Sequence, residues 1–260
     1  MDRTPYQLPF TIDRVPAWRC PVCLTGHLTL DKKSLVIRET AASLKERDHE
    51  AWEPDWIRSV FACVFQCSNE NCREPAACSG VARVEHFEYE DEGGWFQSTE
   101  ELLTPHYFYP PLVLMDIPKK CPETVADYLY DSFALFFVDA GAALNCARTA
   151  VEALLTALGV KRFTIVRGRQ SANGKGAKRS INLHQRIQLL PSKYQEQKDL
   201  LLAVKWLGNA GSHDGGTATT ADLRVAYDLL EHVLAEIYEG KGKKLKAVAL
   251  KVNRRKGPAK

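Results

Sequence analysis

The chain has 260 residues, of which 45% are hydrophobic and 26% are charged, and its formal net charge at pH 7 is +3. This length suits one large domain or two ordinary ones, and this composition is typical of a folded globular protein. The most apolar long segment, 133–160, is interrupted by charged and polar side chains, which excludes a transmembrane helix and a membrane partner.

The N-terminal segment, "MDRTPYQLPFTIDRV", is charged and interrupted by proline. It lacks the apolar centre and the cleavage site of a signal peptide. We therefore expect a cytoplasmic protein.

Six of the eight cysteines lie in the first third of the chain. In a cytoplasmic protein such crowding favours metal binding over disulfides. "RCPVCLTGHL" places Cys20 and Cys23 in a CPxC turn, and "FQCSNENCRE" supplies Cys67 and Cys72 as a second pair. Four thiolates around one ion leave no open coordination position, which predicts a structural zinc site.

Segments 34–39, 56–65 and 80–90 are rich in strand-forming residues with partial alternation. With a cysteine pair on each hairpin tip, they predict a β-rich zinc ribbon over residues 1–104. Cys63 and Cys78 compete as ligands. Because Cys63 shares a strand face with Phe61 and Phe65, we expect it to be a buried apolar residue. Cys78 remains the alternative ligand.

Prolines punctuate residues 105–121 and predict an extended junction between domains. From Pro122 the apolar pattern becomes helical, with Gly159 and Gly240 as expected helix ends. The pattern predicts a helical bundle over residues 122–240, whose helices fall in 122–138, 139–158, 181–190, 194–208 and 220–240. The predicted fold class is therefore α+β, with a β-rich domain before an all-α bundle.

Two basic segments, 153–195 and 241–260, each hold nine Lys and Arg residues and no acid, whereas the other 197 residues hold 17 bases and 32 acids. This asymmetry favours a polyanionic partner. For 241–260 a disordered, solvated tail is the preferred interpretation.

For the internal segment, a mobile phosphate-contacting loop and a merely solvated loop are equally supported. Its glycine spacing and the lack of a hydroxyl after Lys175 exclude a P-loop. The candidate nucleic-acid ligands in this loop are Arg167, Arg169, Lys175, Lys178 and Arg179.

Two pairs of polar residues have i, i+4 spacing in the predicted bundle. Arg148 and Glu152 form one pair, and Asn209 and His213 form the other, near the end of a helix. Two such pairs on facing helices would create a polar pocket in an apolar bundle. Spacing alone instead favours a structural role, in which His213 binds the last carbonyls of its helix.

The sequences "NCARTAVEALL", "HQRI" and "KWLGNAGSHD", after a CPxC knuckle, resemble an uncharacterised bacterial family that couples a zinc ribbon to a helical domain of the HEPN superfamily. The resemblance implies a homodimeric bundle and a link to phage defence. Many superfamily members are metal-independent endoribonucleases, in which a His moves protons and an Arg neutralises phosphoryl charge. By this resemblance, His213 takes the His position and Asn209 the polar position.

The chain departs from that motif at Gly208, where active superfamily nucleases carry Arg. Two hypotheses follow. The preferred one is a module that binds nucleic acid, RNA above DNA, or a partner protein of a defence system. The alternative is an endoribonuclease or toxin-like effector with His213 as general acid/base. Its candidate catalytic residues are His213, Asn209, Lys205, Arg148 and Glu152, with Lys205 or Arg148 replacing the missing Arg.

Overall fold

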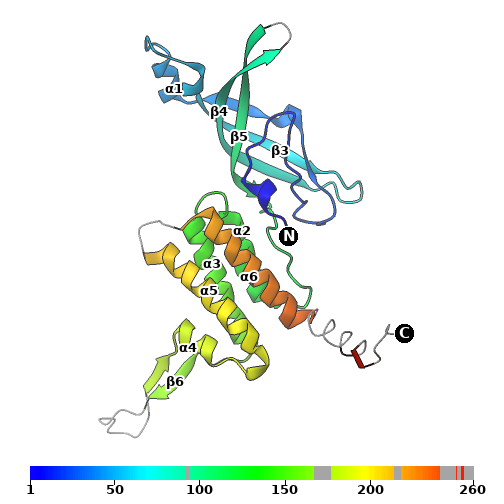
Figure 1. Ribbon diagram of the computed structural model, residues 1–260, viewed down its shortest axis with the longest axis vertical. Helices are drawn as coiled ribbons and strands as arrows, with labels where there is room; N and C mark the ends of the chain where they lie inside the picture. Colours follow the sequence, from blue (N-terminus) through cyan, green and yellow to red (C-terminus); the bar gives the residue numbers. More distant parts are fainter. Residues whose placement is uncertain (92–93, 167–176, 214–217, 241–249, 251–252, 255–260) are drawn as a thin grey trace. The chain divides into compact units, whose positions relative to one another are not determined.

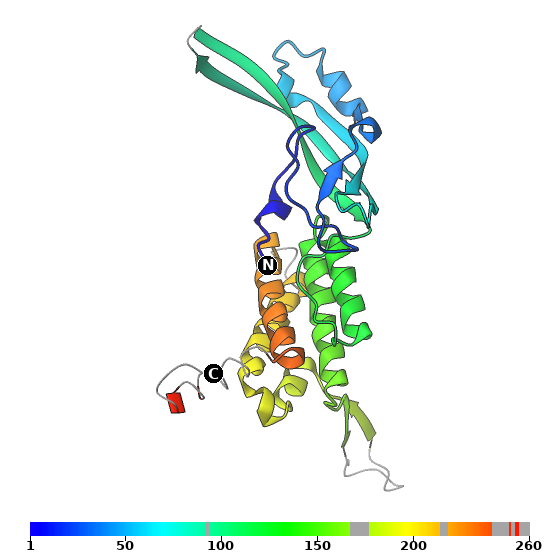
Figure 2. The same cartoon turned by 90° about the vertical axis from the view of Figure 1, so that its right-hand side faces the viewer.

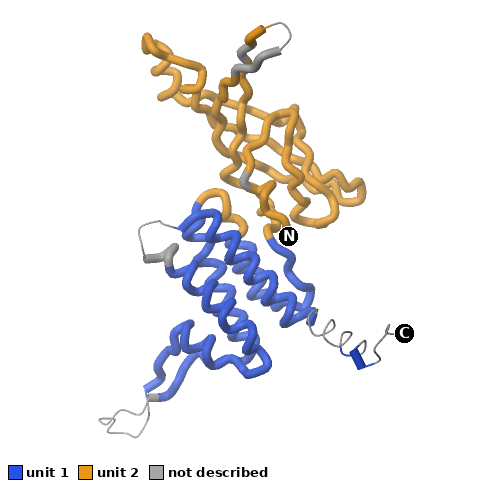
Figure 3. Tube along the Cα trace, viewed as in Figure 1, with its two compact units in different colours: residues 1, 115–132, 139–260 blue, residues 2–114, 133–138 orange. Residues whose placement is uncertain are grey.

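The computed structural model describes residues 1–91, 94–166, 177–213, 218–240, 250 and 253–254. The chain divides into two compact units (Figure 3). Residues 2–114 and 133–138 form the N-terminal unit, and residues 1, 115–132 and 139–260 form the helical unit. The first contains an antiparallel sheet and the second is mainly helical, which confirms the predicted α+β fold.

The N-terminal unit is built around the strand β3, which pairs with β1, β2 and β4, while β5 pairs with β4 (Figure 1). All of these pairings are antiparallel. A short helix, α1 (Ala41–Glu46), follows β2. The strands are β1 (Leu28–Leu30), β2 (Val36–Glu39), β3 (Arg58–Cys67), β4 (Pro75–Asp91) and β5 (Gly94–Tyr109). Thus β5 runs five residues into the segment 105–121 that the sequence analysis treats as a junction.

Alternation along β3 supplies the core of the sheet. Exposed and buried residues alternate without interruption from Arg58 to Cys67, as expected for a strand with one face against the core. Cys63 is buried on the same face as Phe61 and Phe65, which confirms its predicted apolar role. This face packs on Phe10 and Trp18, whose rings meet edge to face at 5.5 Å between centroids.

In the helical unit, α3, α5 and α6 pack against one another (Figures 1 and 2). The hydroxyl of Ser132 on α2 donates to the carbonyl of Ala143 on α3 and lies 2.8 Å from the hydroxyl of Tyr227 on α6. No helix in the described part of the chain is long and apolar enough to cross a membrane. The helices are α2 (Glu123–Leu135), α3 (Ala140–Ala157), α4 (Leu183–Gln188), α5 (Gln195–His213) and α6 (Thr220–Tyr238).

The ends of the helices follow local sequence with one exception. Asp139 caps α3 by accepting a hydrogen bond from the backbone of Ala142. Gly159 and Gly240, the predicted stops after α3 and α6, take positive φ angles of 80° and 60°. The helix predicted to end at Gly208 instead continues to His213 as α5.

The basic segment after α3 contains a hairpin that the sequence analysis did not predict. Its strands are β6 (Phe163–Val166) and β7 (Ala177–Ser180), which pair with each other in antiparallel register. Both views show this hairpin extending away from the helices (Figure 2). The prediction of a simple loop over this segment is therefore wrong for its two ends, while residues 167–176 lie outside the described part.

Candidate functional sites

The four cysteines predicted to hold a metal come together in the N-terminal unit. The Sγ atoms of Cys20, Cys23, Cys67 and Cys72 all lie within 4.8 Å of one another. The Sγ–Sγ distances are 3.8 Å for Cys20–Cys72 and 3.6 Å for Cys23–Cys67. Sulfurs bound tetrahedrally about 2.3 Å from one ion would be separated by about 3.8 Å. The cluster therefore has the dimensions of a metal site.

Two turns of the backbone carry these thiols, one with Cys20 and Cys23 and one with Cys67 and Cys72, and we call each of them a hook. In each hook, the residue after the second cysteine has a positive φ angle, 58° at Leu24 and 49° at Arg73. The turn lets backbone N–H groups point at sulfur: Gly26 donates to Cys23 Sγ at 3.3 Å, and Asn69 donates to Cys67 Sγ at 3.4 Å. Such donors stabilise thiolates, which are the metal-binding form of cysteine.

Gly26 is required by the close approach of the two hooks. A Cβ atom added there would lie 2.5 Å from Cys67 Sγ and 3.0 Å from the backbone nitrogen of Asn69. Any larger residue would displace a ligand sulfur. The sequence analysis did not single out this glycine, because its role depends on a residue more than forty positions away.

The electrostatic surroundings of the four thiols are unequal. Hydrogen bonds from the Thr25 hydroxyl and from the Gly26 backbone lower the pKa of Cys23 to about 5. Burial raises the pKa of Cys67 to about 12. Cys23 is therefore ready to bind a cation as a thiolate, whereas a divalent ion would have to displace the proton of Cys67.

The alternative ligands Cys63 and Cys78 face each other across β3 and β4 and are not members of the cluster. Interaction with Cys63, together with burial, raises the pKa of Cys78. Both residues are buried, so they serve as small core side chains of the sheet.

In the helical unit, the structure brings together three of the predicted catalytic residues. Arg148 and Glu152 form an i, i+4 ion pair on α3, with 3.4 Å between Nη2 and Oε1. Lys205 on α5 is buried, and its Nζ lies 3.1 Å from the ring centroid of Trp206. Burial and the nearby charge of Arg148 lower the pKa of Lys205. Two cations thus lie near each other between α3 and α5, and one of them, Arg148, is paired with a carboxylate.

The other two predicted catalytic residues are less fully described. Asn209 lies on α5 one turn after Lys205 and is half-buried. His213 is the last residue of α5, one turn further on, and its side chain lies outside the described part of the structure. The predicted meeting of the imidazole with Arg148 and Glu152 therefore stays a prediction.

Gly208 lies where α5 crosses α3 most closely. A Cβ atom at this position would be 2.7 Å from Arg148 Cβ and 3.1 Å from the Leu144 carbonyl oxygen. Helix packing therefore explains why this position is occupied by glycine. An Arg side chain could not leave α5 in this direction without separating the helices.

Arg186 on α4 is a functional candidate that the sequence analysis missed. It is only 2% exposed and shares the buried face of α4 with Leu183 and Ile187. Its guanidinium donates to the Glu152 carbonyl at 3.2 Å and to the Thr156 hydroxyl at 2.8 Å. Burial is the main cause that lowers the pKa of Arg186. The polar position inside the apolar face of "LHQRI" was the sequence pattern that could have revealed it.

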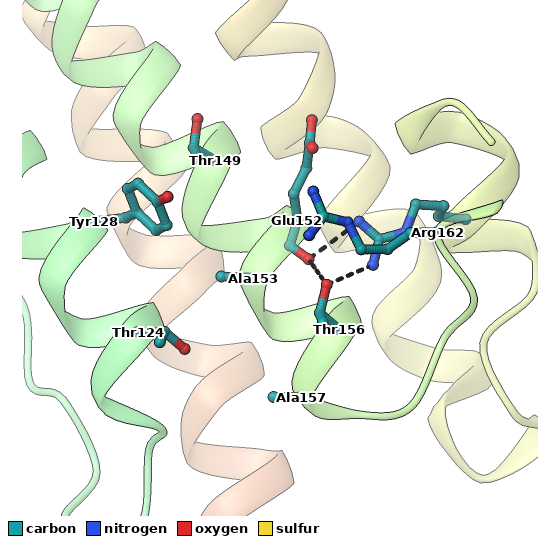
Figure 4. A pocket seen from close by; sticks show the side chains of 9 residues that line it. Thr124, Tyr128, Thr149, Glu152, Ala153, Thr156, Ala157 and Arg162 are labelled. Carbon is teal, nitrogen blue, oxygen red and sulfur yellow. Dashed lines mark hydrogen bonds between the residues drawn. The ribbon is translucent and has the colours of Figure 1, made fainter. Parts of the chain in front are cut away.

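A pocket of about 340 Å³ lies beside Arg186, between α2, α3 and α4 (Figure 4). Figure 4 shows Thr124 and Tyr128 on one side, Glu152 and Arg162 on the other, and Ala153 and Ala157 between them. Its lining residues are Thr124, Tyr128, Thr149, Glu152, Ala153, Thr156, Ala157, Arg162 and Arg186.

The β6–β7 hairpin carries two of the five predicted nucleic-acid ligands, Lys178 and Arg179, both exposed. Lys178 Nζ lies 4.1 Å from the ring centroid of Phe163 across the strand pair. Phe163 is 43% exposed and Ile165 is 71% exposed, so the hairpin presents apolar as well as basic side chains. The other three predicted ligands, Arg167, Arg169 and Lys175, lie outside the described residues.

Comparison with protein families divides the chain in a similar way. Residues 8–108 match the family model of one domain of unknown function (DUF8608), and residues 131–255 match another domain of unknown function (DUF4145). Searches of curated proteins and of solved structures gave no significant match. The function must therefore be argued from the chemistry of the sites.

The close helix packing at Gly208 predicts whether Gly208→Ala raises or lowers the free energy of unfolding. By helix propensity alone, Gly208→Ala would stabilise α5 by about 1 kcal/mol. The collision with Arg148 costs more, because overpacking in a tight interface destabilises by about 1–3 kcal/mol. We expect a lower free energy of unfolding in urea for this variant. A variant more stable than the parent protein would show that the two helices have room to spare.

Proposed function

We propose that this chain is a zinc-stabilised, HEPN-like module that binds nucleic acid, RNA in preference, through the basic side of its helical unit. The observation that carries the proposal is the exposed β6–β7 hairpin, in which Lys178 and Arg179 accompany Phe163 and Ile165. Basic side chains contact phosphates and an exposed aromatic ring stacks on an unpaired base, a combination typical of proteins that bind single strands.

The geometry of the hairpin supports this use. Cross-strand partners lie on the same face, so Phe163, Ile165 and Lys178 share one side and Arg179 lies on the other. The hairpin pairs with no other strand in the described part of the chain. A two-stranded ribbon without its own core is only marginally stable, and contacts with a polyanion on both faces would favour its folded form.

The four-cysteine cluster supports a structural zinc ion as part of the same proposal. Four thiolates at tetrahedral spacing suit zinc and leave no coordination position for substrate or water. The ion would join the hook at Cys20 to the end of β3 at Cys67. It would contribute to the stability of the N-terminal unit and take no direct part in chemistry.

The zinc site can be tested by elemental analysis of the purified protein, for which we expect one zinc per chain. Gly26→Ala should lower zinc affinity by at least about 10-fold, because the added methyl group displaces Cys67 Sγ. Cys63→Ala is the matched control: it removes a buried thiol outside the cluster and should retain the metal. A metal-free protein that unfolds at the same temperature with and without a strong chelator would contradict the site.

The nucleic-acid proposal can be tested by binding single-stranded RNA at several salt concentrations. If Lys178 and Arg179 each contact one phosphate, the double variant Lys178→Gln/Arg179→Gln should reduce the slope of log affinity against log salt by about 1.4. Its affinity should fall for all sequences alike. The control Arg38→Gln/Lys45→Gln removes the same charge from exposed positions of the N-terminal unit. Equal salt slopes for the two double variants would refute the role of the hairpin.

A second candidate function, metal-independent RNA cleavage, is favoured by one observation. Arg148 and Lys205 place positive charge beside the turn of α5 that carries Asn209, where a phosphoryl group would need it. In this mechanism His213 would transfer protons at the 2′-hydroxyl and the leaving oxygen, since its ordinary pKa lies near neutrality.

The cleavage hypothesis predicts that His213→Ala lowers the rate of RNA cleavage in magnesium-free buffer by at least about 100-fold. The exposed His232 on α6 offers a matched control, and His232→Ala should cleave at the parent rate. If the His213 variant is as active as the parent, the observed cleavage does not use this residue. If the parent protein binds RNA without cleaving it, the binding function stands alone.

A further inference from the structure

The pocket between α2, α3 and α4 holds more positive charge than the surrounding groups neutralise. Arg162 and Arg186 line it, and Glu152 is the single carboxylate among its lining residues. That carboxylate is already paired with a third guanidinium, that of Arg148. The pocket is therefore electropositive, although it is lined otherwise by hydroxyl groups and small apolar side chains.

Arg186 is the unusual member of this group. In the described part of the chain, its hydrogen-bond acceptors are the carbonyls of Glu152 and Val160 and the hydroxyl of Thr156, all of them neutral. Its Nε is buried and has no hydrogen-bond partner there. The charge of Glu152 attracts this guanidinium, but in the described part of the chain that carboxylate forms its ion pair with Arg148. A cation that is 2% exposed and has only this shared anion would be compensated by a bound anion.

A role in fixing the end of α3 does not by itself explain why the charged side chain of Arg186 is buried. Arg186 does bind carbonyls near the end of α3, and a neutral donor could do that without burying a charge. The second cation, Arg162, is exposed and follows α3 directly, and its carbonyl accepts a hydrogen bond from the backbone of Ile181 at the base of the β6–β7 hairpin. Its backbone is thus fixed beside the pocket, while its side chain is exposed to solvent.

The rest of the lining suits a phosphoryl group. Thr124, Tyr128 and Thr149 add hydroxyl groups, which donate to phosphate oxygens. Ala153 and Ala157, one turn apart on α3, create the hollow because their side chains are small (Figure 4). The volume of about 340 Å³ lies at the lower end of the range for small-molecule sites.

We propose that this pocket binds the phosphoryl group of a phosphomonoester, with Arg162 and Arg186 as its cationic ligands. The phosphomonoester is either a small molecule or the terminal phosphate of a nucleic acid, since both present the same dianionic group. The proposal does not depend on RNA binding by the hairpin. It assigns a separate site in the helical unit.

The test is calorimetric titration of the full-length protein with inorganic phosphate and with adenosine monophosphate, at constant ionic strength. We expect saturable binding of both. Arg162→Gln should weaken it by at least about tenfold, because a charge-assisted hydrogen bond is lost at an exposed position that the fold does not need. Ala153→Leu should also abolish binding by filling the hollow while leaving every charge in place. Arg38→Gln, an exposed Arg on β2 of the N-terminal unit, is the matched control and should bind like the parent.

Competition separates the two sources of the group. An RNA oligonucleotide with a 5′-phosphate that displaces adenosine monophosphate better than its 5′-hydroxyl counterpart identifies a nucleic-acid end. Displacement by neither oligonucleotide identifies a small phosphomonoester, and equal displacement by both contradicts recognition of a phosphomonoester. Binding that is unsaturable, or that survives both Arg162→Gln and Ala153→Leu, overturns the site. Loss of RNA binding in Lys178→Gln/Arg179→Gln with phosphate binding intact would separate this site from the hairpin.

Discussion

The helical unit depends on the packing of cationic side chains around one helix, α3. Arg148 lies under the crossing with α5, Lys205 approaches it from that helix, and Arg186 reaches the end of α3 from α4. Among the described residues, the ion pair made by these three cations is that of Arg148 with Glu152. Removing cations from water is costly unless they are paired, and the lowered pKa values of Lys205 and Arg186 are the result of that cost. This surplus of positive charge is the basis for expecting an anionic ligand.

In the N-terminal unit, the sheet is joined to a long N-terminal segment that has no regular strand before β1. Phe10 exchanges two backbone hydrogen bonds with Leu103 on β5, and Trp18 fills the centre of the aromatic core. Two residues after Trp18, Cys20 begins the first hook of the four-cysteine cluster. The second hook begins at Cys67, where β3 ends, so the cluster fixes both ends of the connection. A metal there would constrain the unfolded chain as a cross-link does.

Local patterns were enough to predict the elements whose cause is local. The CPxC spacing, the alternation along β3 and the Gly159 stop each depend on residues within one turn or strand. The place of Arg186 on the apolar face of α4 could have indicated its burial, but its partners could not be predicted, because they are carbonyls some thirty positions earlier. The β6–β7 hairpin was missed since its strands have four residues each and, in β7, no buried face. The role of the pocket alanines follows only from the place of α2 beside them.

Gly208 shows how one contact affects both the fold prediction and the choice between functions. Glycine usually marks a helix end, yet here α5 continues past Gly208, and the missing side chain lets the helix approach Arg148. The same approach leaves no room for a cation at this position of α5, and positive charge stands instead at Arg148 on α3 and at Lys205. Arg148, however, is shared with Glu152, and Lys205 is buried. A cation already engaged by a carboxylate gives less stabilisation to charge that develops in a transition state. Lys178 and Arg179 on the hairpin are exposed, and Lys178 packs on the Phe163 ring rather than on a carboxylate, so we favour binding over cleavage.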